Sequence, residues 1–264
     1  MIGTLNLVGL DDFIKSLEDD KCLVKSTMTL KLNTCPASFG QVFSYSVYII
    51  QTKYGLGTCY VPYQSRNLSG KYINKDLRCS TLPVPVKTAY FDSLAAQKKD
   101  STTELIKLSG YPHEKMKARA ELIIDSVNKI GYKREIKNIA LIGAVESIAE
   151  ALIDSNYRVS LTDMNPQLIG HKIASTIVKG GNQTKYEVAN SDCAIVTGMT
   201  IGNNTFSEIL ETAKSNNTSL IMYCETGANL SHFLIDSGVD CVLSEYYPYY
   251  IFCGDSYCRL LYKD

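Results

Sequence analysis

The sequence predicts an α/β protein whose C-terminal half is a Rossmann-like parallel sheet with helices on both faces, preceded by a smaller α+β domain. Three observations lead to this prediction. The stretch from Lys137 to Pro166 has the pattern strand, tight turn, helix, strand, which is a βαβ unit. Apolar strand-like runs and helical patterns then continue to alternate. The first half instead has three strand-like runs followed by helical patterns, as α+β domains do.

Composition limits the class of protein and of partner. The 264 residues are 45% hydrophobic, and 27 basic against 27 acidic residues give a formal net charge of zero. Because no Lys/Arg cluster stands out, we expect no nucleic acid partner. The N-terminus lacks a signal-peptide pattern and no apolar run approaches the roughly 18 residues of a membrane helix, so we expect a cytoplasmic protein without a membrane partner. Nine cysteines without a C-x-x-C pair favour reduced, mostly buried thiols.

The first half is predicted to form a domain over residues 1–131. The expected strands are antiparallel, the second and third forming a hairpin around Gly55 and Gly57; they cover Cys22–Leu32, Ser44–Ile50 and Thr58–Val61. The expected helices cover Leu10–Leu17, Tyr90–Lys98, Thr103–Leu108 and Glu114–Ile130. The last of these holds the 3.6-residue period over about four turns and ends at Gly131, which is a good helix stop.

The second half, residues 132–264, is predicted to be a ligand-binding domain built on the parallel sheet. Its expected strands cover Asn138–Ile142, Tyr157–Leu161, Asp192–Thr197, Ser219–Cys224 and Val239–Ser244. Its expected helices follow Gly143 and cover Leu168–Val178, Phe206–Lys214 and Asn229–Ser237. The tail from Tyr249 to Tyr262 is expected to form an antiparallel hairpin on the sheet edge or against the first domain.

The turn of the βαβ unit carries part of a dinucleotide-binding fingerprint. Asp163 falls 20 residues after Gly143, where such folds place the carboxylate that holds a ribose hydroxyl. Of the three fingerprint glycines, however, only Gly143 is present, and Glu146 would put a negative charge where a pyrophosphate should lie. The pattern therefore predicts Rossmann-like architecture but not ordinary NAD binding.

Polar residues follow the predicted strands, at the edge where open α/β sheets bind ligands. Three strands end in a carboxylate, at Asp163, Glu225 and Glu245, and these would repel one another unless a cation, a hydroxyl-rich ligand or protonation relieves them. The alternative is that these acids cap the following helices. The glycine-rich segment 198–205 is expected to be a loop that presents N–H groups to a ligand, or else a turn with Asn204 or Thr205 as helix cap.

A metal site is a further possibility. No H-x-x-x-H, C-x-x-C or H-E-x-x-H spacing exists, which argues against a closed structural zinc site. Cys224 and Glu225 could bind a metal together with His232 if the loop between them folds back. The alternative for each histidine is an ordinary surface or core residue.

Four segments of the second half, LIGAVESI, TDMNP, SDCAIVTGMTIGNNTFSEIL and TGANLSHFLIDSGVDCVLSE, resemble the family described as putative heavy-metal chelation. Family positions map onto Asp163, Asn165, Pro166, Thr197, Gly198, Thr200, Asn203 and Thr205. The resemblance implies a companion domain similar to the N-terminal domain of enolases, and a site for a metal or metal chelate where the two domains meet. Cys224-Glu225-Thr226-Gly227 departs from the Gly-Pro-Ser-like turn that the family implies, which leaves room for another ligand.

Two hypotheses about function follow, and a third is a domain that has kept the fold and mainly mediates assembly. A small-molecule ligand and a homodimer are the partners that we consider. The first is a protein that binds a small molecule or metal chelate in a cleft between the domains. The second is an enzyme that uses S-adenosylmethionine or another nucleoside cofactor at the strand ends. Both place ligand contacts at Gly143, Ala144, Asp163, Met164, Asn165, Gly198, Thr200, Asn203 and Thr205, and a divalent metal would involve Cys224, Glu225 and His232.

Overall fold

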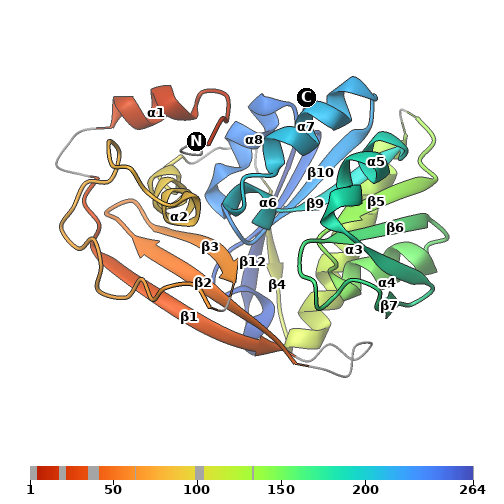
Figure 1. Cartoon of the computed structure of the whole chain (residues 1–264), viewed down its shortest axis with the longest axis horizontal. Helices are drawn as coiled ribbons and strands as arrows, with labels where there is room; N and C mark the ends of the chain where they lie inside the picture. Colours follow the sequence, from red (N-terminus) through yellow and green to blue (C-terminus); the bar gives the residue numbers. More distant parts are fainter. Residues whose placement is uncertain are drawn as a thin grey trace.

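The computed structural model describes residues 5–17, 22–34, 42–62, 64–98, 104–132 and 134–263. Its main feature is a nine-stranded sheet with the order β4-β12-β11-β10-β9-β5-β6-β8-β7 (Figure 1). Six strands are parallel: β5 (Asn138–Ile142), β6 (Arg158–Asp163), β8 (Thr176–Gly180), β9 (Cys193–Thr197), β10 (Ser219–Cys224) and β11 (Cys241–Glu245). The antiparallel strands are β4 (Glu104–Leu108), β12 (Ser256–Tyr262) and β7 (Lys172–Ile173). The predicted Rossmann-like parallel sheet is confirmed.

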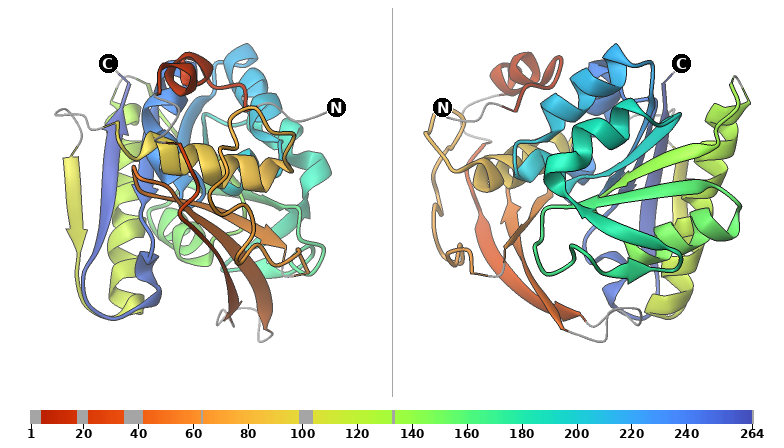
Figure 2. Two further views of the ribbon diagram at one scale, coloured as in Figure 1. Left: turned by 90° about the vertical axis from the view of Figure 1, so that its left-hand side faces the viewer. Right: turned by 45° about the vertical axis from the view of Figure 1, so that its right-hand side comes forward.

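Helices cover both faces of the large sheet because successive residues of its buried strands point to opposite sides. Ile139 and Leu141 share one core with α3 (Pro112–Gly131) and α4 (Glu146–Asp154). Ala140 and Ile142 contribute to a second core on the opposite face, where the other helices pack (Figure 2). These helices are α5 (Thr184–Ala189), α6 (Met199–Gly202), α7 (Phe206–Ser215) and α8 (Ser231–Ser237).

A separate antiparallel sheet of three strands stands beside the large one. It consists of β1 (Ser26–Thr34), β2 (Phe43–Gln51) and β3 (Leu56–Pro62), in the order β1-β2-β3, as the sequence predicts. Helix α2 (Val84–Ala95) packs on it, and α1 (Leu10–Ser16) lies nearby. Buried residues of this unit, such as Ile50 and Tyr90, belong to the same core cluster as Met222 of the large sheet. The two units therefore share one apolar interior.

The buried carboxylate of Asp92 joins the two units. Asp92 lies in α2; its Oδ2 accepts the N–H of Thr58 in β3 at 2.8 Å, and its Oδ1 accepts the N–H of Asn229 at 2.7 Å. Asn229 is in the 3-10 helix η3 (Ala228–Leu230) of the large unit, and its amide donates to the Leu56 carbonyl at 2.9 Å. Burial raises the pKa of Asp92 to about 7.

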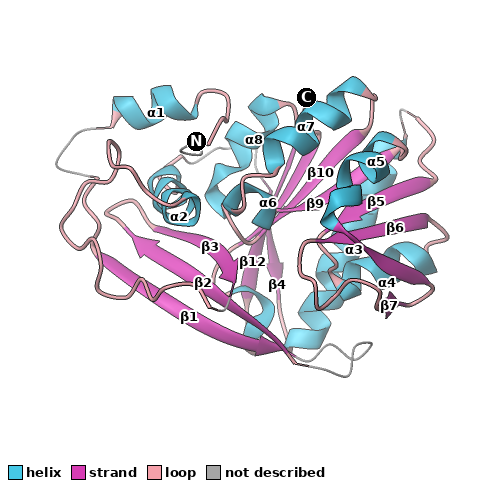
Figure 3. Ribbon diagram, viewed as in Figure 1, coloured by secondary structure: helices cyan, strands magenta, loops and turns pink. Residues whose placement is uncertain are grey.

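Three predicted elements differ from the structure (Figure 3). The helix expected over Thr103–Leu108 is strand β4, paired with β12; its alternating exposure, with Leu105 exposed and Leu108 buried, is the period of a strand. The helix expected over Leu168–Val178 is the β7–β8 hairpin, because Gly170 has a φ of +86° and Thr176, Ile177 and Val178 are β-branched. The expected tail hairpin is a single strand, β12, preceded by the 3-10 helix η4 (Tyr249–Ile251), and it lies between β11 and β4.

The position of β4 bears on the expected boundary at residue 131. Both β4 and α3 precede that boundary, yet they pack with the large sheet. Along the part of the chain that the structure describes, no helix has the length and apolar character that a membrane span requires.

Candidate functional site

The candidate functional site is a cavity of about 960 Å³ at the carboxyl ends of the parallel strands. Strands β5 and β9 are neighbours, but the chain leaves β5 toward β6 and leaves β9 toward β10. Helices that connect to opposite sides at such a switch point leave a crevice above the sheet edge, which is where open α/β sheets bind ligands. Here the small antiparallel sheet closes the crevice from the other side, so residues of β2, β3, β5, β6 and β9 line one space.

Seven of the nine predicted contact residues line this cavity: Gly143, Asp163, Met164, Asn165, Thr200, Asn203 and Thr205. Ala144 and Gly198 lie behind the wall and contribute through their backbones. The N–H of Ala144 donates to Asp163 Oδ2 at 2.9 Å, and the N–H of Gly198 donates to the Tyr223 carbonyl at 2.7 Å. The structure thus brings the strand-end residues together around one space.

Asp163 fixes the geometry of two turns. Its carboxylate accepts the N–H of Ala144 after β5 and, through Oδ1, the N–H of Asn165 at 2.7 Å. Burial raises the pKa of Asp163, and these backbone hydrogen bonds oppose the rise. The carboxylate is therefore held by the backbone on one side and lines the cavity on the other. Asp163 therefore holds two turns and caps no helix, unlike the capping alternative, while its place on the cavity wall agrees with the ligand-facing interpretation.

Gly143 serves packing rather than a phosphate. Its φ is +94°, and a Cβ at this position would lie 2.5 Å from Thr197 Oγ1. Only glycine combines this φ with so close an approach of β5 to β9. The glycine at this position of the dinucleotide-binding fingerprint is thus explained by the contact between two central strands. Glu146, which follows in the turn, occupies the first turn of α4.

The segment 198–205 is a short helix rather than the expected open loop. Helix α6 covers Met199–Gly202, and the Thr200 hydroxyl donates to the Thr197 carbonyl at 2.8 Å. A Cβ on Gly198 would lie 2.4 Å from the Thr226 carbonyl oxygen, so this glycine permits close packing of two backbone segments. Asn203 Oδ1 accepts the N–H and the hydroxyl of Thr205 at 3.1 and 2.7 Å. The donors of Thr200 and Thr205 are used internally, and their oxygens can still accept hydrogen bonds.

Tyr45 and Tyr60 form the opposite wall, and sequence reasoning did not select them. They come from β2 and β3, and their ring centroids are 6.4 Å apart. Burial raises the pKa of Tyr45, and the charge of Asp163 adds to the rise; Asn165 opposes it through a side-chain hydrogen bond. Both residues lie about a hundred positions away from the strand ends that they face, so no local spacing connects them. An indirect signal was the total of 18 tyrosines in a chain without tryptophan.

The charge of the cavity does not suit an anion. Of the described residues that line it, Asp163 and Glu208 are acidic and Lys185 is basic. Lys185 Nζ lies 2.8 Å from Glu208 Oε1, so its charge is already paired. The wall carries an unmatched carboxylate at Asp163 together with hydroxyl and amide groups. Such a wall favours a neutral or positively charged ligand with hydroxyl groups.

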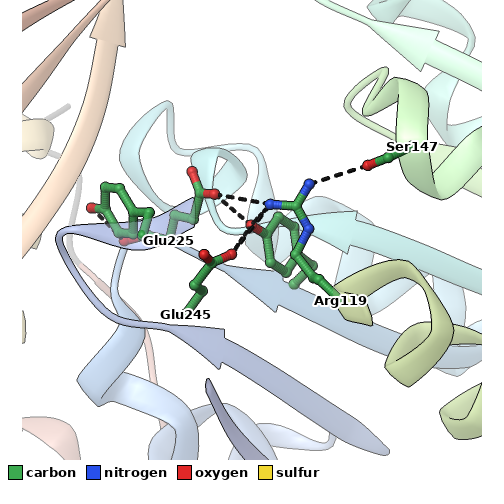
Figure 4. A network of polar contacts seen from close by, with 6 residues as sticks. Arg119, Ser147, Glu225 and Glu245 are labelled. Atoms are coloured by element: carbon green, nitrogen blue, oxygen red, sulfur yellow. Dashed lines mark hydrogen bonds and ion pairs between the residues drawn. The ribbon is translucent and has the colours of Figure 1, made fainter. Parts of the chain in front are cut away.

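Glu225 and Glu245, at the ends of β10 and β11, belong to a buried network with Arg119 of α3 (Figure 4). Arg119 Nη1 lies 3.2 Å from Glu245 Oε2 and 3.4 Å from Glu225 Oε1, and Nη2 donates to Ser147 Oγ at 3.1 Å. The Tyr223 hydroxyl contacts both carboxylates, Glu245 Oε2 at 2.8 Å and Glu225 Oε1 in a very short contact. Two carboxylates thus share a single guanidinium.

The predicted metal set of Cys224, Glu225 and His232 does not form. Neighbouring residues of a strand point to opposite faces, so Cys224 lies in the core beneath α7 and α8 while Glu225 contacts Arg119 on the other side. Burial raises the pKa of the Cys224 thiol, which disfavours the thiolate that binds metal. Among the residues that the structure describes, no three His, Cys, Asp or Glu side chains are placed to hold a metal ion. A bare metal ion therefore does not fit the donors present.

Comparisons with known proteins agree with this architecture. The model of a family described as putative heavy-metal chelation matches residues 129–245. A crystal structure of a family member of unknown function from Pyrococcus horikoshii is 15% identical, covers 93% of this chain and 87% of its own, and has a TM-score of 0.54. A second, from Desulfitobacterium hafniense, is 12% identical, covers 90% and 84%, and has a TM-score of 0.53. At these identities the likeness shows the fold. A search of curated proteins found no match.

Proposed function

We propose that this protein, whose residues 129–245 match the model of the family described as putative heavy-metal chelation, binds a small organic molecule with hydroxyl groups, free or as a preformed metal chelate, in the cavity between its two sheets. The observation that carries the proposal is the cavity itself. Its volume of about 960 Å³ lies at the upper end of the range for ligand pockets. Its walls offer tyrosine rings on one side and carboxylate, amide and hydroxyl groups on the other.

Any metal would enter this site with its own ligands. The donor set of the described residues does not form a cage for a bare ion. A chelate instead presents an organic surface, to which Asp163, Asn165 and Asn203 can make hydrogen bonds and against which Tyr45 and Tyr60 can pack. The unmatched carboxylate at Asp163 favours chelates that are neutral or positively charged.

The test compares bare ions with neutral chelates. We expect ferric tris(acetohydroxamate) or copper(II) bis(glycinate) to raise the melting temperature saturably, while the corresponding metal salts do not. The Asp163→Asn variant keeps an oxygen for the Ala144 N–H, but it loses the charge and turns an amide NH2 toward the Asn165 N–H, so binding should weaken by at least about tenfold, the value of one charge-assisted hydrogen bond. Asp192→Asn is the matched control, because Asp192 also accepts two backbone N–H groups, from Lys137 and Asn138, at the opposite end of β5. Equal stabilisation by salts and chelates would contradict the proposal.

A nucleoside cofactor is the second candidate, favoured by the place of Asp163 at the end of β6 beside the Gly143 turn, with both residues on the cavity wall. This is where Rossmann-type folds hold ribose hydroxyls. S-adenosylmethionine and adenosine belong in the same melting series. Stabilisation by either one that Asp163→Asn removes, with no response to chelates, would favour this candidate over the first.

A further inference from the structure

The buried network around Arg119 contains a proton on one of its two carboxyl groups, in addition to the phenolic proton of Tyr223. The hydroxyl of Tyr223 carries a single proton, yet it contacts Glu225 Oε1 and Glu245 Oε2. A phenol can donate to only one carboxylate, so the other contact requires a proton on a carboxyl group. The charges agree with this extra proton. Glu225 and Glu245 are 14% and 0% exposed and share the single positive charge of Arg119, which balances one carboxylate.

The groups around Glu225 and Glu245 favour a pair in which one of the two carboxyl groups is protonated. Burial, and then the charge of Glu245, raise the pKa of Glu225 to about 7, against the opposing effects of Arg119, Tyr223 and Tyr60. The groups that face the pair come from six elements: Tyr60 of β3, Arg119 of α3, Ser147 of α4, Tyr223 of β10, Tyr249 and Tyr250 of η4, and Cys258 of β12. Arg119 stacks between the rings of Tyr223 and Tyr250, at 4.8 and 4.7 Å from their centroids.

Tyr60 connects this network to the cavity. It lines the cavity and also makes a side-chain hydrogen bond to Glu225. Its ring is held between those of Tyr45 and Tyr249, with centroids 6.4 and 5.9 Å away. The end of β10 is held in place as well, because the Glu225 carbonyl accepts the hydroxyl of Thr58 at 2.6 Å. Tyr60 therefore lies between the cavity wall and the carboxyl pair, where its side chain interacts with Glu225.

We propose that the Glu225–Glu245 pair is an acid–base site that serves the cavity, and that the Tyr60 hydroxyl passes protons between this pair and a bound ligand. In the forward direction the ligand gains the phenolic proton of Tyr60, Tyr60 takes the carboxyl proton of Glu225, and Arg119 and Tyr223 stabilise the resulting carboxylate. The reverse direction accepts a proton from an acidic hydroxyl, such as that of a hydroxamate, catechol or phenol. The inference rests on the proposed function, because it requires that the cavity hold a ligand.

The test uses a probe that needs no natural ligand. Benzenesulfonyl fluoride is neutral and small enough for the cavity, and it reacts with a tyrosine hydroxyl beside a base: the S–O bond forms, the S–F bond breaks, fluoride leaves, and the phenolic proton goes to Glu225. We expect the labelling rate of Tyr60 in the full chain, measured by peptide mass spectrometry, to rise about tenfold per pH unit up to about 7 and then level. Tyr132, which is 94% exposed, is the internal control, because its labelling reports how the reagent itself responds to pH at an exposed tyrosine.

Two variants make the test specific. Glu225→Gln should remove the break near pH 7 and leave Tyr60 at least tenfold less reactive at pH 8. Glu245→Gln removes the negative charge that raises the pKa of Glu225, so the break in the pH profile of Tyr60 labelling should move to lower pH. The inference is overturned if Tyr60 is not labelled, if its pH profile matches that of Tyr132, or if the break persists in Glu225→Gln. The labelling of Tyr60 does not depend on chelate binding. If the chelates do not stabilise the protein, the labelling experiment still tests the acid–base site.

Discussion

At the scale of single residues, Gly143 shows how a motif position can be kept by packing alone. Its φ of +94° and the 2.5 Å approach that a Cβ would make to Thr197 act independently of any ligand. Asp163 shows the converse case, in which one carboxylate holds two turns and faces the cavity at the same time. A residue type at a motif position thus identifies the local backbone geometry more securely than it identifies a ligand.

The Gly143→Ala variant, compared with Gly170→Ala, separates the cost of the positive φ from the cost of the close approach to Thr197. The strained φ costs about 1–3 kcal/mol, and displacement of Thr197 adds to the loss of unfolding free energy. Gly170→Ala is the control, because Gly170 has a φ of +86° but a Cβ there would meet no atom within 4 Å, so only the backbone cost applies. We expect denaturant unfolding to show a larger loss for Gly143→Ala. Equal losses would mean that β5 and β9 do not approach each other so closely.

At the scale of elements, the site depends on how β3 of the small sheet meets the segment after β10. The N–H of Tyr60 donates to Thr226 Oγ1 at 2.9 Å, and the N–H of Gly227 donates to the Thr58 carbonyl at 3.2 Å. These contacts place Tyr60 between the cavity and Glu225. The Tyr60 side of the cavity wall is therefore held by a contact between residues 166 positions apart in the sequence.

Replacing Thr226 by valine should disturb this contact without changing the side-chain volume. Thr226 is 1% exposed, so the Tyr60 N–H would lose its acceptor in a buried setting, at a cost of about 1–3 kcal/mol of unfolding free energy. Thr212→Val on the exposed side of α7 should cost less than about 0.5 kcal/mol. Thermal unfolding of the two variants measures the difference. A neutral Thr226→Val would show that the contact does not hold β3 to the end of β10.

Secondary structure was predicted correctly where a regular apolar pattern extends over many residues, and the predictions were wrong in short segments. The 20-residue helix α3 has apolar positions over several turns, and its predicted bounds are close to those observed. In Glu104–Leu108 and in β7–β8 the segments have five residues or fewer, too few for their apolar spacing to distinguish helix from strand. Pairing with another strand decided those cases: β12, far along the chain, for β4, and the nearby β6 for β8.

At the scale of the whole molecule, the two sheets behave as one packed body. One core cluster contains buried residues of both sheets, and Asp92 links α2 to β3 and to η3. The raised pKa of Asp92 makes this link depend on pH. In the unfolded chain an aspartate titrates near 4. The folded state therefore binds a proton more tightly than the unfolded state between about pH 4 and pH 7.

It follows that the unfolding free energy contributed by Asp92 is greatest below about pH 4 and is lost as the pH rises to about 7. We expect the wild-type unfolding free energy to fall between pH 5 and pH 7, by up to about 1.4 kcal/mol per pH unit for each proton released. Asp92→Asn should make this slope shallower in urea titrations at a series of pH values. Asp125→Asn, a change on the exposed side of α3, serves as the control and should keep the wild-type slope. A slope that does not change in Asp92→Asn would contradict the assignment.

The βαβ unit, the alternation of strand and helix, the antiparallel strands of the first half and the polar strand ends could all be predicted from the amino-acid sequence, because each depends on residues close together in the chain. Three features emerged only from the folded structure: β4 and α3 pack with the large sheet, Tyr45 and Tyr60 share a cavity with Asp163 and Asn165, and Cys224 and Glu225 point to opposite sides of β10. The physical reason is that a cavity wall and a buried ion cluster are set by side-chain packing between distant segments, and local periodicity carries no record of which segments meet.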